Sequence, residues 1–162
     1  MEDRNRGHRH RLSEAKIAFE STIVENANWK LVWENNRECY HCAGNHPELC
    51  RTFPEAPSAT GVQGAMSDPE MRVHWDRCEA AGLPSEFQIA ESGQHRVVRM
   101  PLLDGAVSYT LSGQPAVRRP LSDDLKEAQI GALLMFNYPT TWNHVLGDHA
   151  VSSPRSSPKR VY

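Results

Sequence analysis

A chain of 162 residues is long enough for one domain with a hydrophobic core. Only 39% of the residues are hydrophobic and the mean hydropathy is negative, which indicates a water-soluble domain with flexible ends rather than a membrane protein. The formal net charge is −2, so a basic surface can arise only from an uneven distribution of charge.

The charge is indeed uneven, because both ends of the chain are basic. Residues 1–12 form an arginine-rich arm and residues 151–162 a Ser/Pro-rich basic tail, and we expect both to be disordered around a single domain over residues 13–150. No apolar segment follows the charged N-terminus, so no secretory signal is predicted. The expected location is the cytoplasm or the nucleus, where thiols stay reduced.

The first half of the domain shows helix, strand and loop patterns in turn. Ser13 can cap a helix that runs to about Ala27, and Trp29 to Trp33 alternates like a short strand. Thr52 to Met66 is rich in Pro, Gly, Ala and Ser, which is typical of a loop. A helix should begin at Pro69 and end near Gly82.

The second half predicts a sheet followed by two helices. Three short segments, Phe87 to Ala90, Arg96 to Leu103 and Ala106 to Leu111, are separated by glycine-containing turns and predict a three-stranded antiparallel meander. Helices are expected from Leu125 to about Asn137 and from Thr141 to His149. The predicted fold class is therefore α+β, a small zinc-stapled segment with an antiparallel three-stranded meander packed by helices.

The zinc prediction comes from a cluster of cysteines and histidines within residues 37–52. Reduced cysteines this close together are typical metal ligands, and a Cys-x-x-Cys turn supplies two at the separation zinc requires. With Gly44 giving backbone freedom for a tight loop, the most compact ligand set is Cys39, Cys42, His46 and Cys50.

These residues resemble the zinc knuckle of retroviral and retroelement nucleocapsid proteins, Cys-x2-Cys-x4-His-x4-Cys, although both later gaps are one residue shorter here. The resemblance covers residues 39–50 only. It implies binding of single-stranded RNA or DNA, with Tyr40 as a stacking platform. It also implies phosphate contacts from flanking and N-terminal arginines, namely Arg37, Arg51, Arg4, Arg6, Arg9 and Arg11.

A second ligand set remains open. His74 and Cys78 lie four residues apart on one face of the predicted helix from Pro69, and with Cys39 and Cys42 they also make a zinc shell. A shell of four cysteines, Cys39, Cys42, Cys50 and Cys78, is the third alternative.

A zinc ion with four protein ligands has no open position for catalysis, so the sequence predicts a non-enzymatic protein. The favoured hypothesis is a small zinc-binding, nucleic-acid-binding regulatory protein, such as a viral or mobile-element accessory factor. The alternative is a zinc-stapled module that binds and regulates a partner protein. Neither hypothesis involves a membrane.

Overall fold

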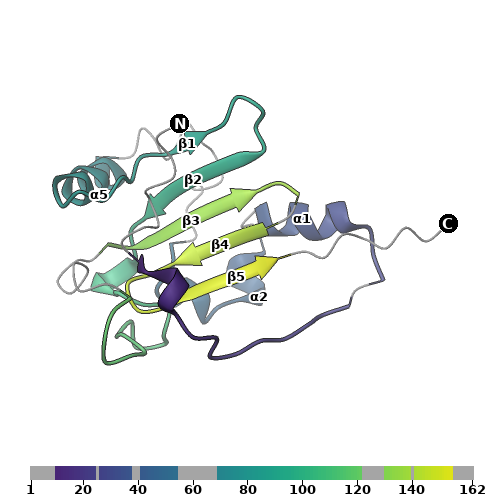
Figure 1. Ribbon diagram of the computed structural model, residues 1–162, viewed down its shortest axis with the longest axis horizontal. Helices are drawn as coiled ribbons and strands as arrows, with labels where there is room; N and C mark the ends of the chain where they lie inside the picture. Colours follow the sequence, from purple (N-terminus) through teal and green to yellow (C-terminus); the bar gives the residue numbers. More distant parts are fainter. Residues whose placement is uncertain are drawn as a thin grey trace.

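The computed structural model describes residues 10–24, 26–37, 41–54, 69–121, 130–139 and 141–154 (Figure 1). The described part is organised around a five-stranded sheet in the order β1-β2-β3-β4-β5, in which every pair of neighbours is antiparallel. The strands are β1 (Gln88–Ile89), β2 (His95–Met100), β3 (Ala132–Asn137), β4 (Thr141–Val145) and β5 (Ala150–Pro154).

In the described part of the chain, three α-helices accompany the sheet: α1 (Trp29–Arg37), α2 (Cys42–Asn45) and α5 (Pro69–Ala80). Figure 1 shows α5 at the β1 end of the sheet, and α1 and α2 near β4 and β5. Short 3-10 turns occur at η3 (Leu12–Glu14), η4 (Leu49–Arg51) and η5 (Leu103–Gly105). The helix predicted from Pro69 is confirmed.

The central strand β3 is covered on both faces. Leu134 packs in the larger core with Trp75 of α5, while the neighbouring Leu133 packs on the opposite face with Val97 and Val145. Because both faces of this strand are buried, its sequence is a continuous apolar run without alternation. The larger core also receives side chains from α1 and from the segment after α2, which fixes these two elements against the sheet.

The predicted three-stranded meander is wrong. Its first two strands exist as β1 and β2, joined through a turn in which Gly93 has φ +68°. Residues 106–111, however, form turns, and β2 pairs instead with β3, with Val98 opposite Leu134. The third strand was misplaced because the pairing partner of β2 lies more than 30 residues further along the chain.

The two predicted C-terminal helices are also wrong over the described residues, since residues 132–137 and 141–145 are strands. Residues 125–129 of the first predicted helix lie outside the described part of the chain. A short apolar run fits a buried helix and a buried strand equally well, and here the pairing of Leu133 with Val145 decides for the sheet.

The N-terminal predictions are reversed in the structure. Residues 15–24 are extended instead of helical. The segment predicted as a strand is helix α1, which begins after Asn28 because the Asn28 side chain accepts a hydrogen bond of 3.0 Å from the Lys30 N–H.

The predicted tail begins inside the sheet, since residues 151–154 belong to β5. Residues 1–9 of the predicted arm and residues 155–162 of the predicted tail lie outside the described residues, as does most of the loop predicted from Thr52 to Met66. Within the described ranges, no helix has the length and apolar character needed to cross a membrane.

Candidate metal centre

Two histidines face each other across helix α2. His41 is the residue before the helix and His46 the residue after it, and their ring centroids lie 5.4 Å apart with the ring planes at 77°. The single turn is closed by hydrogen bonds from the Asn45 N–H to the His41 carbonyl (2.9 Å) and from the His46 N–H to the Cys42 carbonyl (2.8 Å). His41 is half-buried and His46 is exposed, so the pair opens toward solvent on one side.

Aromatic packing anchors the chain before this turn. Trp33 of α1 is 3% exposed and contacts Tyr138 edge to face at 5.4 Å, and Trp29 contacts the same ring at 5.8 Å. Tyr138 lies in the turn between β3 and β4. The helix that leads to His41 is therefore fixed to one end of the sheet.

The chain after the turn is anchored in the core. Leu49 packs at the edge of the larger core, and Phe53 is buried within it. The Cys50 N–H donates to the His46 carbonyl at 3.2 Å, so the histidine is joined directly to this anchored segment. Helix α1 on one side and Phe53 on the other hold the two imidazoles at their spacing.

The compact set of predicted ligands is only partly visible. Cys39 lies outside the described residues, whereas Cys42 is buried and Cys50 is half-buried. Gly44 is an ordinary residue of α2 without a positive φ, so the expected role as a loop glycine is wrong. Within the described residues no group of three or more His, Cys, Asp or Glu side chains is placed to hold a metal ion.

The alternative pair of predicted ligands, His74 and Cys78, lies on α5 with both side chains buried. His74 Nε2 is 3.7 Å from Cys78 Sγ, and both residues are buried. Arg77 donates to His74 Nδ1 at 3.0 Å; since arginine only donates, Nδ1 carries no proton and Nε2–H points at the sulfur. Burial and, to a smaller extent, Arg77 and Arg99 lower the pKa of His74 to about 4. This pair is a packed hydrogen-bonded contact in the described structure.

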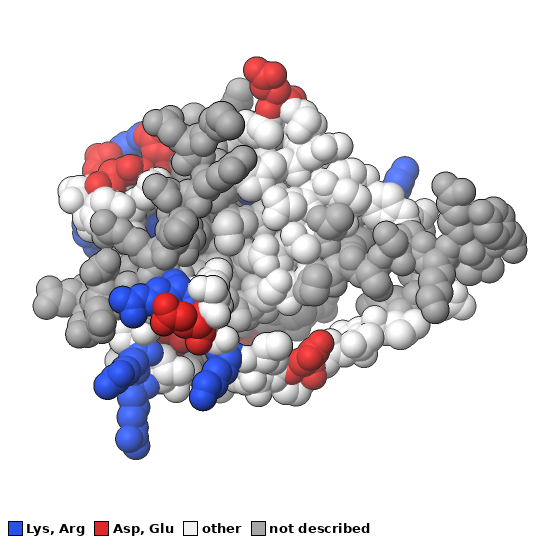
Figure 2. All heavy atoms as spheres, viewed as in Figure 1, with Lys and Arg blue, Asp and Glu red and all other residues white. Residues whose placement is uncertain are grey.

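Of the residues predicted to bind nucleic acid, Arg11, Arg37 and Arg51 belong to the described part of the chain. Tyr40 and three of the four arm arginines, Arg4, Arg6 and Arg9, lie outside the described residues, and Arg11 is exposed beside η3. Arg37 ends α1 and Arg51 ends η4. On the face drawn in Figure 2, basic side chains collect near one edge with acidic groups among them. This view shows mixed charge rather than a continuous basic stripe.

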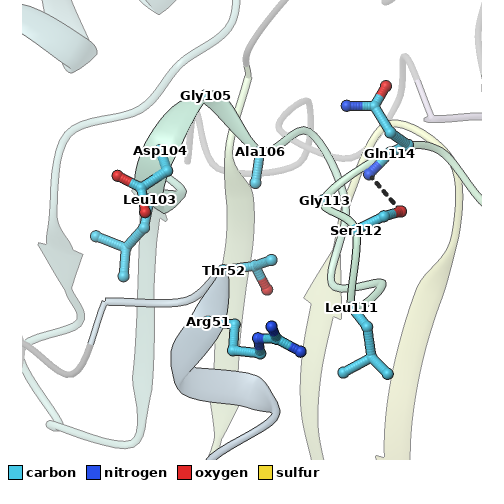
Figure 3. A pocket seen from close by; sticks show the side chains of 10 residues that line it. All are labelled: Arg51, Thr52, Leu103, Asp104, Gly105, Ala106, Leu111, Ser112, Gly113 and Gln114. Atoms are coloured by element: carbon cyan, nitrogen blue, oxygen red, sulfur yellow. Dashed lines mark hydrogen bonds between the residues drawn. The ribbon is translucent and has the colours of Figure 1, made fainter.

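Arg51 and Thr52 instead line a surface hollow of about 140 Å³ with the loop at residues 103–114 (Figure 3). The Leu103 N–H donates to the Thr52 carbonyl at 2.8 Å, and Thr52 is 3% exposed. The hollow marks the place where the 103–114 loop is tied to the segment that carries His46.

A second polar cluster lies next to that segment. Tyr109 contacts Phe53 edge to face at 5.7 Å, and the Tyr109 hydroxyl and His144 Nδ1 share a hydrogen bond of 3.0 Å. Burial lowers the pKa of His144 to about 4 and raises the pKa of Tyr109, so both groups are neutral at physiological pH. The neutral rings of Tyr109 and His144, hydrogen-bonded to each other, both pack against Phe53.

The chain is similar to proteins of one enzyme family. The family model for the ring hydroxylating alpha subunit (catalytic domain) matches residues 3–159. A glycine betaine monooxygenase oxygenase subunit of Pseudomonas aeruginosa (strain UCBPP-PA14) is 40% identical over 142 residues, which is 86% of this chain and 32% of that protein. The corresponding subunit of Chromohalobacter salexigens is 38% identical, over 86% of this chain and 31% of its own length. The chain thus spans about a third of the length of these curated relatives.

These similarities overturn the predicted function. The family consists of oxygenases that use a Rieske [2Fe–2S] cluster and a non-haem iron, so the expected non-enzymatic, zinc-binding, nucleic-acid-binding protein is wrong, as is the nucleocapsid resemblance. The alternative, a zinc-stapled module that regulates a partner protein, is also wrong, because the cofactors of this family contain iron and not zinc. The zinc prediction gave the cysteines more weight than the histidines. Thiolates favour zinc, whereas non-haem iron in oxygenases is held by two histidines and one carboxylate.

His41 is the residue that the sequence reasoning missed. It was passed over as a spacer inside Cys-x-x-Cys, although two histidines five positions apart are a signal of their own. A one-turn helix between them brings the two rings together, as the 5.4 Å separation shows.

Proposed function

This chain belongs to the ring-hydroxylating alpha-subunit family, and on that basis we propose that it forms part of an oxygenase catalytic domain in which His41 and His46 bind the non-haem iron. The observation that carries the proposal is the pairing of these two imidazoles across α2. His46, already predicted as a metal ligand, keeps that role for iron instead of zinc. When bound, such an iron supplies the activation of dioxygen that an oxygenase requires.

The donor set fits two of the three positions of the iron site. The two imidazoles match the histidine pair, and Trp33 and Phe53 anchor the chain before and after them in the core. The carboxylate is not among the described residues, where no third acidic, histidine or cysteine side chain joins the pair. We therefore assign two ligands to this segment and leave the third to a carboxylate from outside the described residues.

The Rieske cluster does not fit the described residues. One of its irons takes two cysteines and the other takes two histidines, a set of four that the described part does not bring together. This agrees with the match to the catalytic domain alone. We propose that the cluster is held by another part of the oxygenase.

The described side chains on either side of the pair have a positioning role. Trp33 and Phe53 fix the two ends of the segment, and the Tyr109–His144 pair closes the space behind Phe53 with neutral groups. Tyr109 and His144 are both neutral at neutral pH, so this hydrogen-bonded pair adds no charge to the interior. An imidazole binds a metal through an unprotonated nitrogen, so His41 and His46 must each present one toward the shared position.

The relatives suggest the substrate class and the setting. Their names give glycine betaine as substrate, so we propose a small quaternary ammonium compound as the substrate of an oxygenase containing this chain. We further propose a partnership with an electron-donating reductase and a cytoplasmic location. The nuclear alternative has no support, since the relatives are bacterial proteins.

Anaerobic Fe²⁺ titration of the purified chain tests the iron site directly. We expect one Fe²⁺ per chain, measured by metal analysis after gel filtration and by calorimetry. Removing either ligand, in His41→Ala or His46→Ala, should weaken binding at least about 10-fold, the effect expected when one ligand of a metal site is lost. The proposal fails if both variants bind Fe²⁺ like the unmodified chain.

His95→Gln is the matched control. His95 is a half-buried histidine of β2 that is hydrogen-bonded to Asn137 at 2.6 Å, and glutamine can keep a hydrogen bond there. Unchanged Fe²⁺ binding in this variant separates the loss of specific ligands from the loss of any histidine. The substrate class is tested separately, by O₂ uptake with glycine betaine in an oxygenase that contains the segment.

A further inference from the structure

Residues 16–24 carry an unusual amount of exposed apolar surface. In the described part of the chain, the four most exposed large hydrophobic side chains all lie here: Ile17 (81%), Phe19 (84%), Ile23 (79%) and Val24 (91%). Isolated exposed hydrophobic residues are common, but four within eight residues form a patch of the kind that marks an interaction site.

The segment has the pattern of a β-strand. Ile17, Phe19 and Ile23 occupy odd-numbered positions and therefore share one face of an extended chain, while Glu20, Thr22 and Val24 lie on the other. The segment has no assigned helix or turn, follows a drawn-out path in Figure 1, contains neither Gly nor Pro, and is rich in β-branched residues. Yet no backbone hydrogen bond joins residues 16–24 to the sheet within the described residues. The segment therefore has the sequence pattern of a β-strand without backbone hydrogen bonds to a neighbouring strand of the described sheet.

One edge of the described sheet is open to pairing with a further strand. The strand order ends with β5, a five-residue strand whose outer side pairs with no other described strand. At the opposite edge β1 is only two residues long, which is one way that proteins limit further pairing. Val151 of β5 is 40% exposed, so apolar surface continues onto the open edge.

The directions of β5 and of residues 16–24 determine which way a strand between them would run. Figure 1 shows residues 15–24, in dark purple, on the β5 side of the sheet and running the same way as the β5 arrow. Neighbours in this sheet alternate in direction. A single strand running the opposite way could therefore pair antiparallel with both β5 and residues 16–24. The described residues contain no such strand.

We propose that an additional antiparallel β-strand docks between β5 and residues 16–24, and that it comes from the portion of the oxygenase polypeptide that has no counterpart in this sequence. The matched region covers only 31–32% of the relatives, so ample polypeptide exists there to supply it. The occupant is an extended segment with apolar side chains at alternate positions, which cover Ile17, Phe19 and Ile23. This inference does not depend on the iron site.

Complementation between fragments tests the proposal. The full chain is mixed with two separate pieces of the P. aeruginosa relative, one preceding and one following the matched 142 residues. We expect a one-to-one complex with one of the pieces by sedimentation velocity. In that complex, amide hydrogen exchange of residues 16–24 and of β5 should slow by at least about 10-fold, since formation of a ladder protects both.

Charge substitutions on the two faces of the segment provide the control. Phe19→Asp and Ile23→Asp should weaken the complex at least about 10-fold, whereas Thr22→Asp, with the same charge on the opposite face, should retain it. All three side chains are exposed, so the isolated variants should match the unmodified chain by circular dichroism.

Three results would overturn the proposal: no complex with either piece, equal binding by the Phe19→Asp and Ile23→Asp variants, or self-association of the chain that protects residues 16–24 without any added piece. The last result would identify a second copy as the occupant.

Discussion

The Tyr109 hydroxyl and Nδ1 of His144 lie 3.0 Å apart in the interior, which ties the 103–114 loop to the middle of β4. Tyr109→Phe removes the hydroxyl and leaves a buried imidazole nitrogen without this hydrogen bond. We expect the free energy of unfolding to fall by about 1–3 kcal/mol, measured by urea denaturation.

Tyr138→Phe is the comparison for that measurement. Tyr138 packs through its ring against Trp33 and is 36% exposed, so loss of its hydroxyl should change stability by less than about 0.5 kcal/mol. Equal effects of the two substitutions would contradict the role given to the Tyr109–His144 hydrogen bond.

Stability should decline in mild acid because three histidines are buried in the neutral form. Burial lowers the pKa of His10, His74 and His144 to about 4, against 6.5 for an unperturbed histidine. Between these values the unfolded chain binds more protons than the folded chain, so the contribution of each histidine is complete above about pH 6.5 and is lost as the pH falls toward 4. Each contribution is on the order of 3 kcal/mol.

Urea denaturation at pH 7.5, 6 and 5 measures this decline. His144→Phe removes one titrating group, so stability in this variant should depend less steeply on pH between 7.5 and 5. A free energy of unfolding that stays constant over this range would show that the histidines are not held neutral.

Gly131 should tolerate no larger residue. Its φ is +66°, and an added Cβ would lie 1.8 Å from the Met100 carbonyl oxygen, so Gly131→Ala should destabilise the protein by more than about 3 kcal/mol. Gly44→Ala is the counterpart in α2, where an added Cβ meets nothing within 4 Å. We expect it to be neutral or stabilising by up to about 1 kcal/mol, measured in thermal unfolding.

The described cysteines should differ in their reactivity. Cys50 is half-buried, whereas Cys42 and Cys78 are buried, and burial raises the pKa of the Cys78 thiol. A maleimide reagent should therefore modify Cys50 first and Cys78 only on unfolding, as followed by peptide mass spectrometry. Modification of Cys78 in the native protein at the rate of Cys50 would contradict the packing around α5.

Local signals in the sequence were enough for the elements that local chemistry decides. The helix from Pro69 begins with an N-cap pattern, and β1 and β2 flank a glycine turn, so each could be predicted from a few neighbouring residues. Strand β3 could not, because it pairs with β2, which lies more than 30 residues earlier in the chain. Strand β4 follows β3 closely, but its short apolar pattern also fits a helix. Helix α1 was missed because five residues of alternation fit either structure.

The proposed iron site lies in the same segment as the predicted zinc site, but it uses different ligands. The segment around residues 39–50 was identified, and His46 with it, since a dense group of ligand-type residues is visible in any sequence. The choice between thiolate and imidazole ligands requires the geometry of α2, where His41 and His46 meet. No carboxylate joins the two histidines within the described residues, so the third ligand of the proposed site has no assignment in this segment.

The length of the single turn α2 sets the separation and relative orientation of the two imidazoles. One residue more or fewer between His41 and His46 would rotate one ring about 100° around the helix axis and separate the pair. The number of residues in this turn is therefore under stricter constraint than their identity. Substitutions at Ala43 or Gly44 are expected to be tolerated among natural variants, whereas insertions and deletions there are expected to be absent.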